Sequence, residues 1–164
     1  MPRRRLSHVD ASGAARMVDV SDKPLSARTA TARGRIWISR AAMRLVRAGR
    51  LEKGGVVEVA RLAGVMAAKR TAEAIPLCHP LPLGGVDVEL TPRVDGFAIE
   101  ARVRTEARTG AEMEALHAVA VAALTVYDMV KAADRGMRIG EIRLVEKRGG
   151  ARGDYREPRR GGGR

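Results

Sequence analysis

The clearest alternation of apolar and polar residues lies in the middle of the chain. Apolar residues alternate with acidic ones over residues 86–90, which is the period of a strand with one buried face. After a turn at Asp95-Gly96, apolar residues alternate with charged ones over residues 97–104. The two segments are therefore predicted to pair as a β-hairpin.

Apolar residues recur at helical spacing in two longer segments. Residues 56–70 are predicted to form one helix, and residues 110–135 a second, longer one. A shorter helix is expected to run to Ala48, with Ser39 as its N-cap.

Three further apolar segments complete the pattern. Strands are expected at residues 16–21, 34–39 and 139–146. If residues 40–70 form one crossover, the order from Arg35 onward is strand, helix, strand, strand, helix, strand. That order predicts an α+β fold, a ferredoxin-like split βαβ sandwich in which an antiparallel sheet carries helices on one face.

The length of 164 residues suits one domain, and a hydrophobic content of 45% supports a packed core. This domain is expected to span residues 15–147. Residues 1–14 are expected to form a flexible N-terminal segment, and residues 148–164, rich in Arg and Gly, to be too Gly-rich to fold.

A formal net charge of +12 predicts an anionic partner. Phosphates of any kind satisfy this charge, so nucleotides and nucleic acid are both candidates. Single-stranded RNA is usually read by exposed rings, whereas aromatic residues make up only 2% here and Phe97 falls on the apolar side of its strand. A basic RNA-binding domain on a ferredoxin-like sheet remains the alternative interpretation.

Other features narrow the class of protein. Cys78 is the single cysteine, which excludes a disulfide framework or a three-cysteine iron–sulfur site within the chain. The first residues lack the apolar stretch of a signal peptide, and the longest apolar segment, 118–126, is too short to span a bilayer. A cytoplasmic protein without a membrane partner is expected.

Lysine is scarce in this basic chain. The chain has five lysines beside 26 arginines, so Arg evidently serves wherever a plain positive charge suffices. Lysine can release its proton when its environment is tuned, and Arg cannot. The lysines are therefore candidates for proton transfer or phosphate contact, although each could equally be an ordinary surface residue. They are Lys23, Lys53, Lys69, Lys131 and Lys147.

The loop of residues 75–85 contains three prolines, which exclude a helix and hold an extended loop. His79 in this loop has the titration range of a general acid–base group, but a lone histidine is more often structural. Cys78 is interpreted as a small buried residue and not a nucleophile, because nothing local would lower its pKa.

Acidic residues lie near both ends of the long predicted helix. Thr109 and Glu112 match a capping box, and Glu114 in the first turn would favour the helix dipole. Asp128 and Lys131, three residues apart, could merely form a surface pair. Spacing alone therefore favours structural roles at both ends.

Four long blocks in order resemble the MoaC family, and the resemblance covers about residues 6–155. The first is LSHVDASGAARMVDVSDK, near the N-terminus. KGGVVEVARLAGVMAAKRTAEAIPLCHPLPL resembles the central block of the family, and TGAEMEALHAVAVAALTVYDMVKA its helical signature. The ending LVEKRGG-A-RGDY resembles the C-terminus of the family. Several long blocks in the right order are far more specific than one short motif.

The resemblance assigns site residues by block. It implies catalytic roles for Asp128, Lys131, Lys53 and His79, with Asp128 as the residue assigned as catalytic in the family. It implies substrate-binding roles for Leu77, Cys78, His79, Glu112, Met113, Glu114, Asp19, Lys23, Arg28 and Lys147. The chain has Arg108 where the family commonly has lysine before TG, which would preserve a charge but not a proton-transfer role.

The resemblance also implies the reaction. A lyase of molybdenum-cofactor biosynthesis would convert 3′,8-cyclo-7,8-dihydro-GTP into cyclic pyranopterin monophosphate and release pyrophosphate. No metal site or cofactor is expected for the chemistry, with Mg²⁺ as a candidate companion of the triphosphate. The implied assembly is a homohexamer built as a trimer of dimers, with a functional link to the radical enzyme that makes the substrate.

Overall fold

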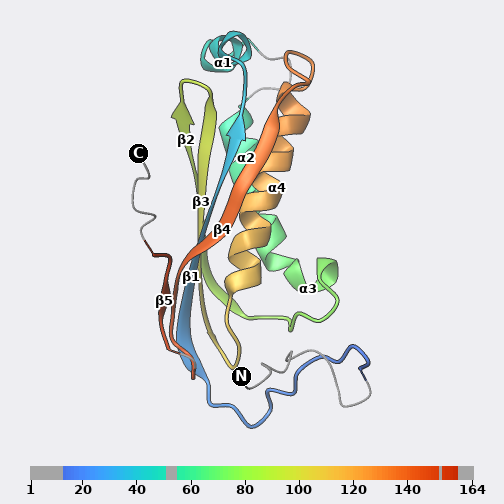
Figure 1. Ribbon diagram of the computed structural model, residues 1–164, viewed down its shortest axis with the longest axis vertical. Helices are drawn as coiled ribbons and strands as arrows, with labels where there is room; N and C mark the ends of the chain where they lie inside the picture. Colours follow the sequence, from blue (N-terminus) through green and yellow to red (C-terminus); the bar gives the residue numbers. More distant parts are fainter. Residues whose placement is uncertain (1–12, 51–54, 152, 159–164) are drawn as a thin grey trace.

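The computed structural model describes residues 13–50, 55–151 and 153–158 (Figure 1). Its elements in chain order are β1 (Ser26–Trp37), α1 (Arg40–Arg47), α2 (Val56–Lys69), α3 (Thr71–Ala74), β2 (Leu83–Arg93), β3 (Gly96–Ala107), α4 (Glu112–Val130), β4 (Arg138–Arg148) and β5 (Tyr155–Arg156).

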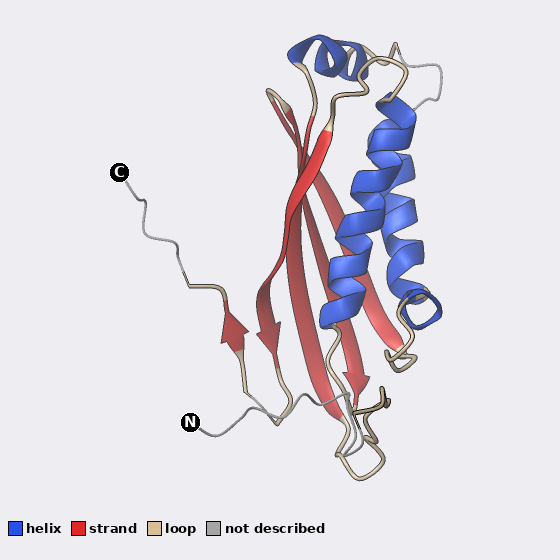
Figure 2. Cartoon of the chain, turned by 45° about the vertical axis from the view of Figure 1, so that its right-hand side comes forward, coloured by secondary structure: helices blue, strands red, loops and turns tan. Residues whose placement is uncertain are grey.

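The strands form one sheet in the order β2-β3-β1-β4-β5, and all neighbours are antiparallel. The first four strands have the split βαβ arrangement, in which β1 lies between β3 and β4. Helices α2 and α4 lie side by side on one face of the sheet, and none of the described helices covers the other face (Figure 2). The predicted ferredoxin-like α+β fold is confirmed.

Small residues bring the long helix close to the central strand. Ala30 and Ala32 on β1 are buried beneath the helices. Gly34 has no room for a side chain, because a Cβ there would lie 2.6 Å from Cγ1 of Val119 on α4. A core poor in aromatic residues can thus be packed densely by close helix–sheet approach.

Of the two strands predicted at the N-terminal end, one is absent and the other is present but starts earlier than predicted. Residues 16–21 form no strand, and Met17 there is about half exposed. Strand β1 begins at Ser26, eight residues before the predicted start, because its early inward positions carry small alanines that give little hydrophobic contrast. The predicted hairpin, by contrast, is present with its turn at Val94-Asp95.

The long helix ends before the predicted residue 135. Helix α4 stops at Val130, and Asp134 lies in the turn that follows. The Asp134 carboxylate accepts hydrogen bonds from the backbone N–H of Ser39 and of Gly136, both at 2.8 Å. These contacts favour a turn over further helix, and the Ser39 N–H is the main cause that lowers the pKa of Asp134. Ser39 caps α1 as predicted, accepting from the N–H of Ala42.

Part of the Arg/Gly-rich tail is folded, contrary to the expectation for residues 148–164. Tyr155 and Arg156 pair with β4, and the Glu157 carboxylate accepts a hydrogen bond from Nε of Arg143 at 2.9 Å. Charged side chains anchor this segment where apolar ones are lacking. Residues 1–12, 152 and 159–164 lie outside the described part of the chain, so flexibility of the N-terminal segment stays a prediction.

Helix α4 is long and apolar enough to cross a membrane by length and composition alone. Half of its most apolar window is nevertheless buried inside the protein, as in a core helix. The buried positions follow helical spacing toward the sheet and α2, so burial against the rest of the chain accounts for the hydropathy.

Candidate functional site

The first turn of α4 carries an acidic side chain that is paired with the end of β4. The Lys147 ammonium lies 3.1 Å from Oε1 of Glu112, and both side chains are largely buried. The predicted capping box is wrong, because the N-cap is Ala111 and has no side-chain cap. Glu112 instead folds over Gly110, where a Cβ would collide with its carboxylate. Glu112 therefore contributes a negative charge to the site and does not cap the helix.

Glu114 is the buried acid of the site. It is only 4% exposed, and burial raises its pKa to about 7 from the ordinary value of 4.5, with a smaller rise caused by the charge of Glu112. A carboxyl group with such a pKa can both hold and release a proton near neutral pH. This is the chemistry that proton transfer to or from a small substrate requires.

The raised pKa of Glu114 predicts how stability depends on pH. The folded protein binds this proton more tightly than the unfolded chain, so Glu114 lowers stability as pH rises from about 4.5 to about 7, and the loss is complete above that range. Glu114→Gln should therefore be more stable than wild type by roughly 1–3 kcal/mol at about pH 8 and similar to it near pH 4.5.

Thermal unfolding of both proteins at the two pH values measures this difference. Glu89→Gln, which changes an exposed carboxylate on β2, is the matched control and should give the same small difference at both pH values. A Glu114→Gln difference that does not change with pH would show that Glu114 is not a neutral acid in the folded protein.

The proline-containing loop after α3 lies beside this helix start. Leu77, Cys78 and His79 are half-buried in it. Burial, and then the charge of Glu114, raise the pKa of the Cys78 thiol, so Cys78 is placed near Glu114 and is poorly suited to act as a nucleophile. The raised pKa agrees with the prediction that Cys78 is not a nucleophile, but the residue is half-buried and not buried as predicted.

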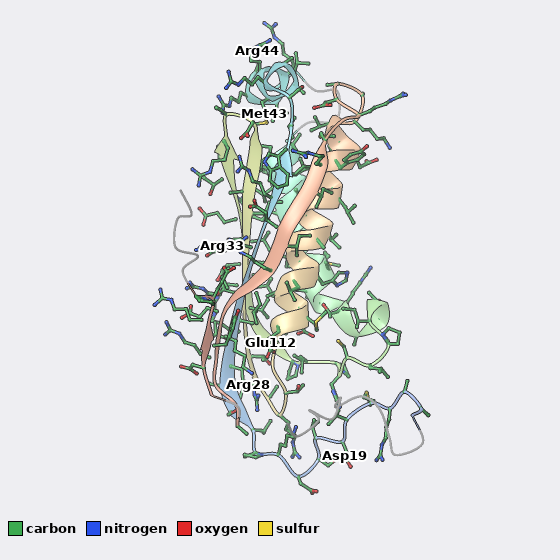
Figure 3. All side chains as sticks on the ribbon, viewed as in Figure 1. Asp19, Arg28, Arg33, Met43, Arg44 and Glu112 are labelled. Atoms are coloured by element: carbon green, nitrogen blue, oxygen red, sulfur yellow. The ribbon has the colours of Figure 1, made fainter. Side chains whose placement is uncertain are left out.

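Residues of the N-terminal segment and of β1 lie at the same end of the molecule (Figure 3). Asp19 accepts a hydrogen bond from the N–H of Ser21 at 2.9 Å, which is the main cause of its lowered pKa, and the charge of His79 adds to the effect. Arg28 faces the helical side of β1, and its guanidinium donates to the carbonyl oxygens of Ala107 (2.9 Å) and Arg108 (3.1 Å). Carbonyl bonds fix this guanidinium without neutralising its charge.

The positions of the remaining residues assigned by resemblance are less closely defined relative to Glu112 and Glu114. Met113 is 39% exposed at the start of α4. Lys23 is exposed, and its backbone N–H bonds the carbonyl of Val20 in the turn that follows Asp19. Lys53 lies outside the described residues.

Asp128 and Lys131 lie at the opposite end of α4. Nζ of Lys131 donates to Oδ1 of Asp128 at 2.7 Å, and both side chains are more than half exposed. Glu114 and Asp128 are fourteen positions apart, which corresponds to about 21 Å along a helix axis. The structure therefore gathers most of the assigned substrate-binding residues at one end of α4 and leaves the assigned catalytic pair at the other.

Over residues 13–50, 55–151 and 153–158, no cluster of three or more His, Cys, Asp or Glu side chains could hold a metal ion. The groups gathered at the start of α4 are a proton-exchanging carboxyl and cations suited to phosphate. Fold and site together define an α+β protein with the means to bind an anionic substrate and move protons on it.

Comparison with known proteins agrees with this class. The MoaC family profile matches residues 17–150, so the chain belongs to the MoaC family. A cyclic pyranopterin monophosphate synthase of Thermomicrobium roseum is 60% identical over 153 residues, which cover 92% of each chain. The enzyme of the same name from Methylobacterium sp. (strain 4-46) is 60% identical over 92% of this chain and 95% of its own length. The enzyme of the same name from Parvibaculum lavamentivorans is 54% identical over 95% of this chain and 99% of its own length.

Proposed function

We infer that this chain catalyses the reaction for which its relatives are named, the formation of cyclic pyranopterin monophosphate in molybdenum-cofactor biosynthesis. The substrate we propose is 3′,8-cyclo-7,8-dihydro-GTP, and the second product is pyrophosphate. The observation that carries this proposal is the convergence of Glu112, Glu114, Cys78 and Lys147 at one end of α4, in a chain at least 54% identical to these relatives over most of its length.

The groups at this end suit the two parts of such a substrate. Lys147 and Arg28 supply positive charge for the triphosphate and for the departing pyrophosphate. Glu114 supplies a carboxyl group that can exchange a proton with the ring system near neutral pH. The cyclic phosphate forms as pyrophosphate leaves, and the rings rearrange by proton transfer without a net redox step.

We propose that Asp128 and Lys131 act on the same substrate from a second copy of the chain. Their distance from Glu114 along α4 is too great for contact with one small ring system. A two-fold dimer that brings the end of one α4 beside the start of another would build two equivalent sites. The hexamer of the family, a trimer of dimers, is compatible with this arrangement.

The remaining features of the proposal concern the cellular setting. No protein-bound cofactor is proposed, and Mg²⁺ would arrive with the triphosphate as part of the substrate. The reaction requires a radical enzyme to supply the cyclised GTP, and we propose the cytoplasm as the site of both steps.

Among the described residues, no feature of the open face favours the alternative of an RNA-binding sheet. Phe97 is 1% exposed beneath the helices, and the Trp37 ring is covered by the guanidinium groups of Arg35 and Arg138 at 5.1 and 5.5 Å. A hollow of about 810 Å³ on this face is lined by arginines and glutamates in balance, such as the pair of Arg33 and Glu100 at 2.6 Å. This face therefore presents neither exposed aromatic rings nor an excess of positive charge that would bind RNA.

The proposed function is tested with the purified protein and the cyclised GTP intermediate. Pyrophosphate release with formation of the cyclic phosphate, in equal amounts, is expected. A preparation that is folded, as judged by its cooperative melting, and releases no pyrophosphate would refute the proposed reaction.

A further inference from the structure

A second proton-carrying side chain lies one turn beyond Glu114 on α4. His117 is half-buried, and its Nδ1 is 3.2 Å from Oγ1 of Thr71. Thr71 begins α3 and is 1% exposed, so water cannot replace this contact. Neither residue stands out in the sequence, because they are 46 positions apart and match no motif.

The surroundings of Thr71 decide which nitrogen of the imidazole carries the proton. Oγ1 of Thr71 also lies 3.1 Å from the carbonyl oxygen of Ala67 and 3.2 Å from that of Ala68. Carbonyls only accept, and oxygen atoms this close repel unless a hydrogen lies between them, so the single hydroxyl hydrogen points to the carbonyls. Oγ1 is then the acceptor for His117, whose Nδ1 must carry the hydrogen. Nε2 is left as the acceptor nitrogen of the ring.

His117 and Glu114 face the same segment of the chain. Side chains three residues apart on a helix are neighbours, with Cβ atoms about 5–6 Å apart. His117 contacts Thr71 at the start of the segment 71–78, and the charge of Glu114 acts on Cys78 at its end. The two side chains are therefore neighbours on one side of α4, close enough for a proton to pass between them through water.

We propose that His117 is a proton relay for Glu114, held in the required tautomer by Thr71. The proposal rests on the proposed function and adds to it the route by which a buried carboxyl exchanges protons with solvent. The Glu114 carboxyl gives its proton through a water molecule to Nε2, which leaves a carboxylate and an imidazolium. Nε2 then gives that proton to water and returns to the Nδ1–H form, so protons balance and no electrons are transferred to another group. His117 and Thr71 act through Glu114 and are positioning residues, not catalytic ones.

The variant His117→Asn distinguishes a proton-relay role of His117 from a purely structural one. The asparagine amide takes the place of Nδ1 and still donates to Thr71, but nothing replaces Nε2. We expect an unchanged melting temperature, KM within about 2-fold and a kcat lowered about 10²-fold, the lower end of the scale for proton-transfer groups. His117→Ala should lose a similar factor and regain part of it when imidazole is added to the solution. Wild-type kcat in His117→Asn would overturn the relay, whereas an inactive wild-type protein would refute the proposed function instead.

The tautomer is measured without reference to activity. The ¹⁵N chemical shifts of the His117 ring, assigned by the signals lost in His117→Asn, should show a protonated Nδ1 and an unprotonated Nε2 in the wild-type protein above neutral pH. Thr71→Ser keeps the hydroxyl and should keep this pattern and the activity. Thr71→Val removes it and should give a mixture of tautomers with a lowered kcat. An Nε2–H tautomer in the wild-type protein would overturn the proposal even if Thr71→Val fails to fold.

Discussion

Lys131→Arg is expected to lose at least roughly 10²-fold in turnover, the usual scale for general acid–base groups. The variant keeps the positive charge, and an Arg at this position can still pair with Asp128, which Lys131 contacts at 2.7 Å. It loses only the ability to give up a proton near neutral pH. Because the pair is more than half exposed, the exchange should leave the free energy of unfolding almost unchanged. Lys53→Arg is expected to lose a similar factor for the same reason.

Steady-state turnover with the cyclised GTP substrate measures this effect. Lys69→Arg on the exposed side of α2 is the matched control and should behave as wild type. Near-wild-type turnover by both Lys131→Arg and Lys53→Arg would show that these lysines act through charge alone. The scarcity of lysine would then have no chemical meaning in this chain.

The fold was predictable where side-chain hydrophobicity contrasts strongly along the chain. The hairpin of β2 and β3 alternates apolar and charged residues over most of residues 86–90 and 97–104, so its strands and turn follow directly from the pattern. The first half of β1 has Ala and Thr in place of large apolar residues, and its burial results from how closely α4 packs on it. Where packing alone makes a position buried, the sequence pattern is too weak to show it.

Tertiary contacts that compete with local preference were not predictable. Asp134 ends the helix by bonding the backbone of Ser39, a residue 95 positions away. The capping box at Thr109 fails because Glu112 pairs with Lys147 on β4. In both cases the local motif favours one structure, and a partner distant in sequence stabilises another.

The site was predictable in its residue types but not in its arrangement. Charge and lysine scarcity indicated phosphate binding and proton transfer, and the family blocks assigned the individual residues. The sequence could not show that burial makes Glu114 a neutral-pH acid, nor that His117 meets Thr71. These properties depend on how α4 lies against α3 and the loop that follows it.

The central proposal is that each chain contributes to two active sites. The start of its α4 belongs to one site and the end of its α4 belongs to the other. Glu114→Gln alters the start of α4 and Asp128→Asn its end, and each protein alone should lose most of its turnover. When equal amounts are unfolded together and refolded, about half of the dimers should be heterodimers, each with one intact site. About a quarter of the wild-type sites should then be restored. Glu112→Gln mixed with Glu114→Gln is the control, because both changes lie at the same end and leave no site intact.

Turnover of the refolded Glu114→Gln and Asp128→Asn mixture is therefore the decisive measurement, with native mass spectrometry to count heterodimers. The account predicts recovery of about a quarter of wild-type turnover, in proportion to the heterodimers formed, and no recovery in the Glu112→Gln control. Heterodimers formed in the expected number without any gain over the separate variants would contradict it. The elongated substrate would then have to span both ends of α4 within a single chain.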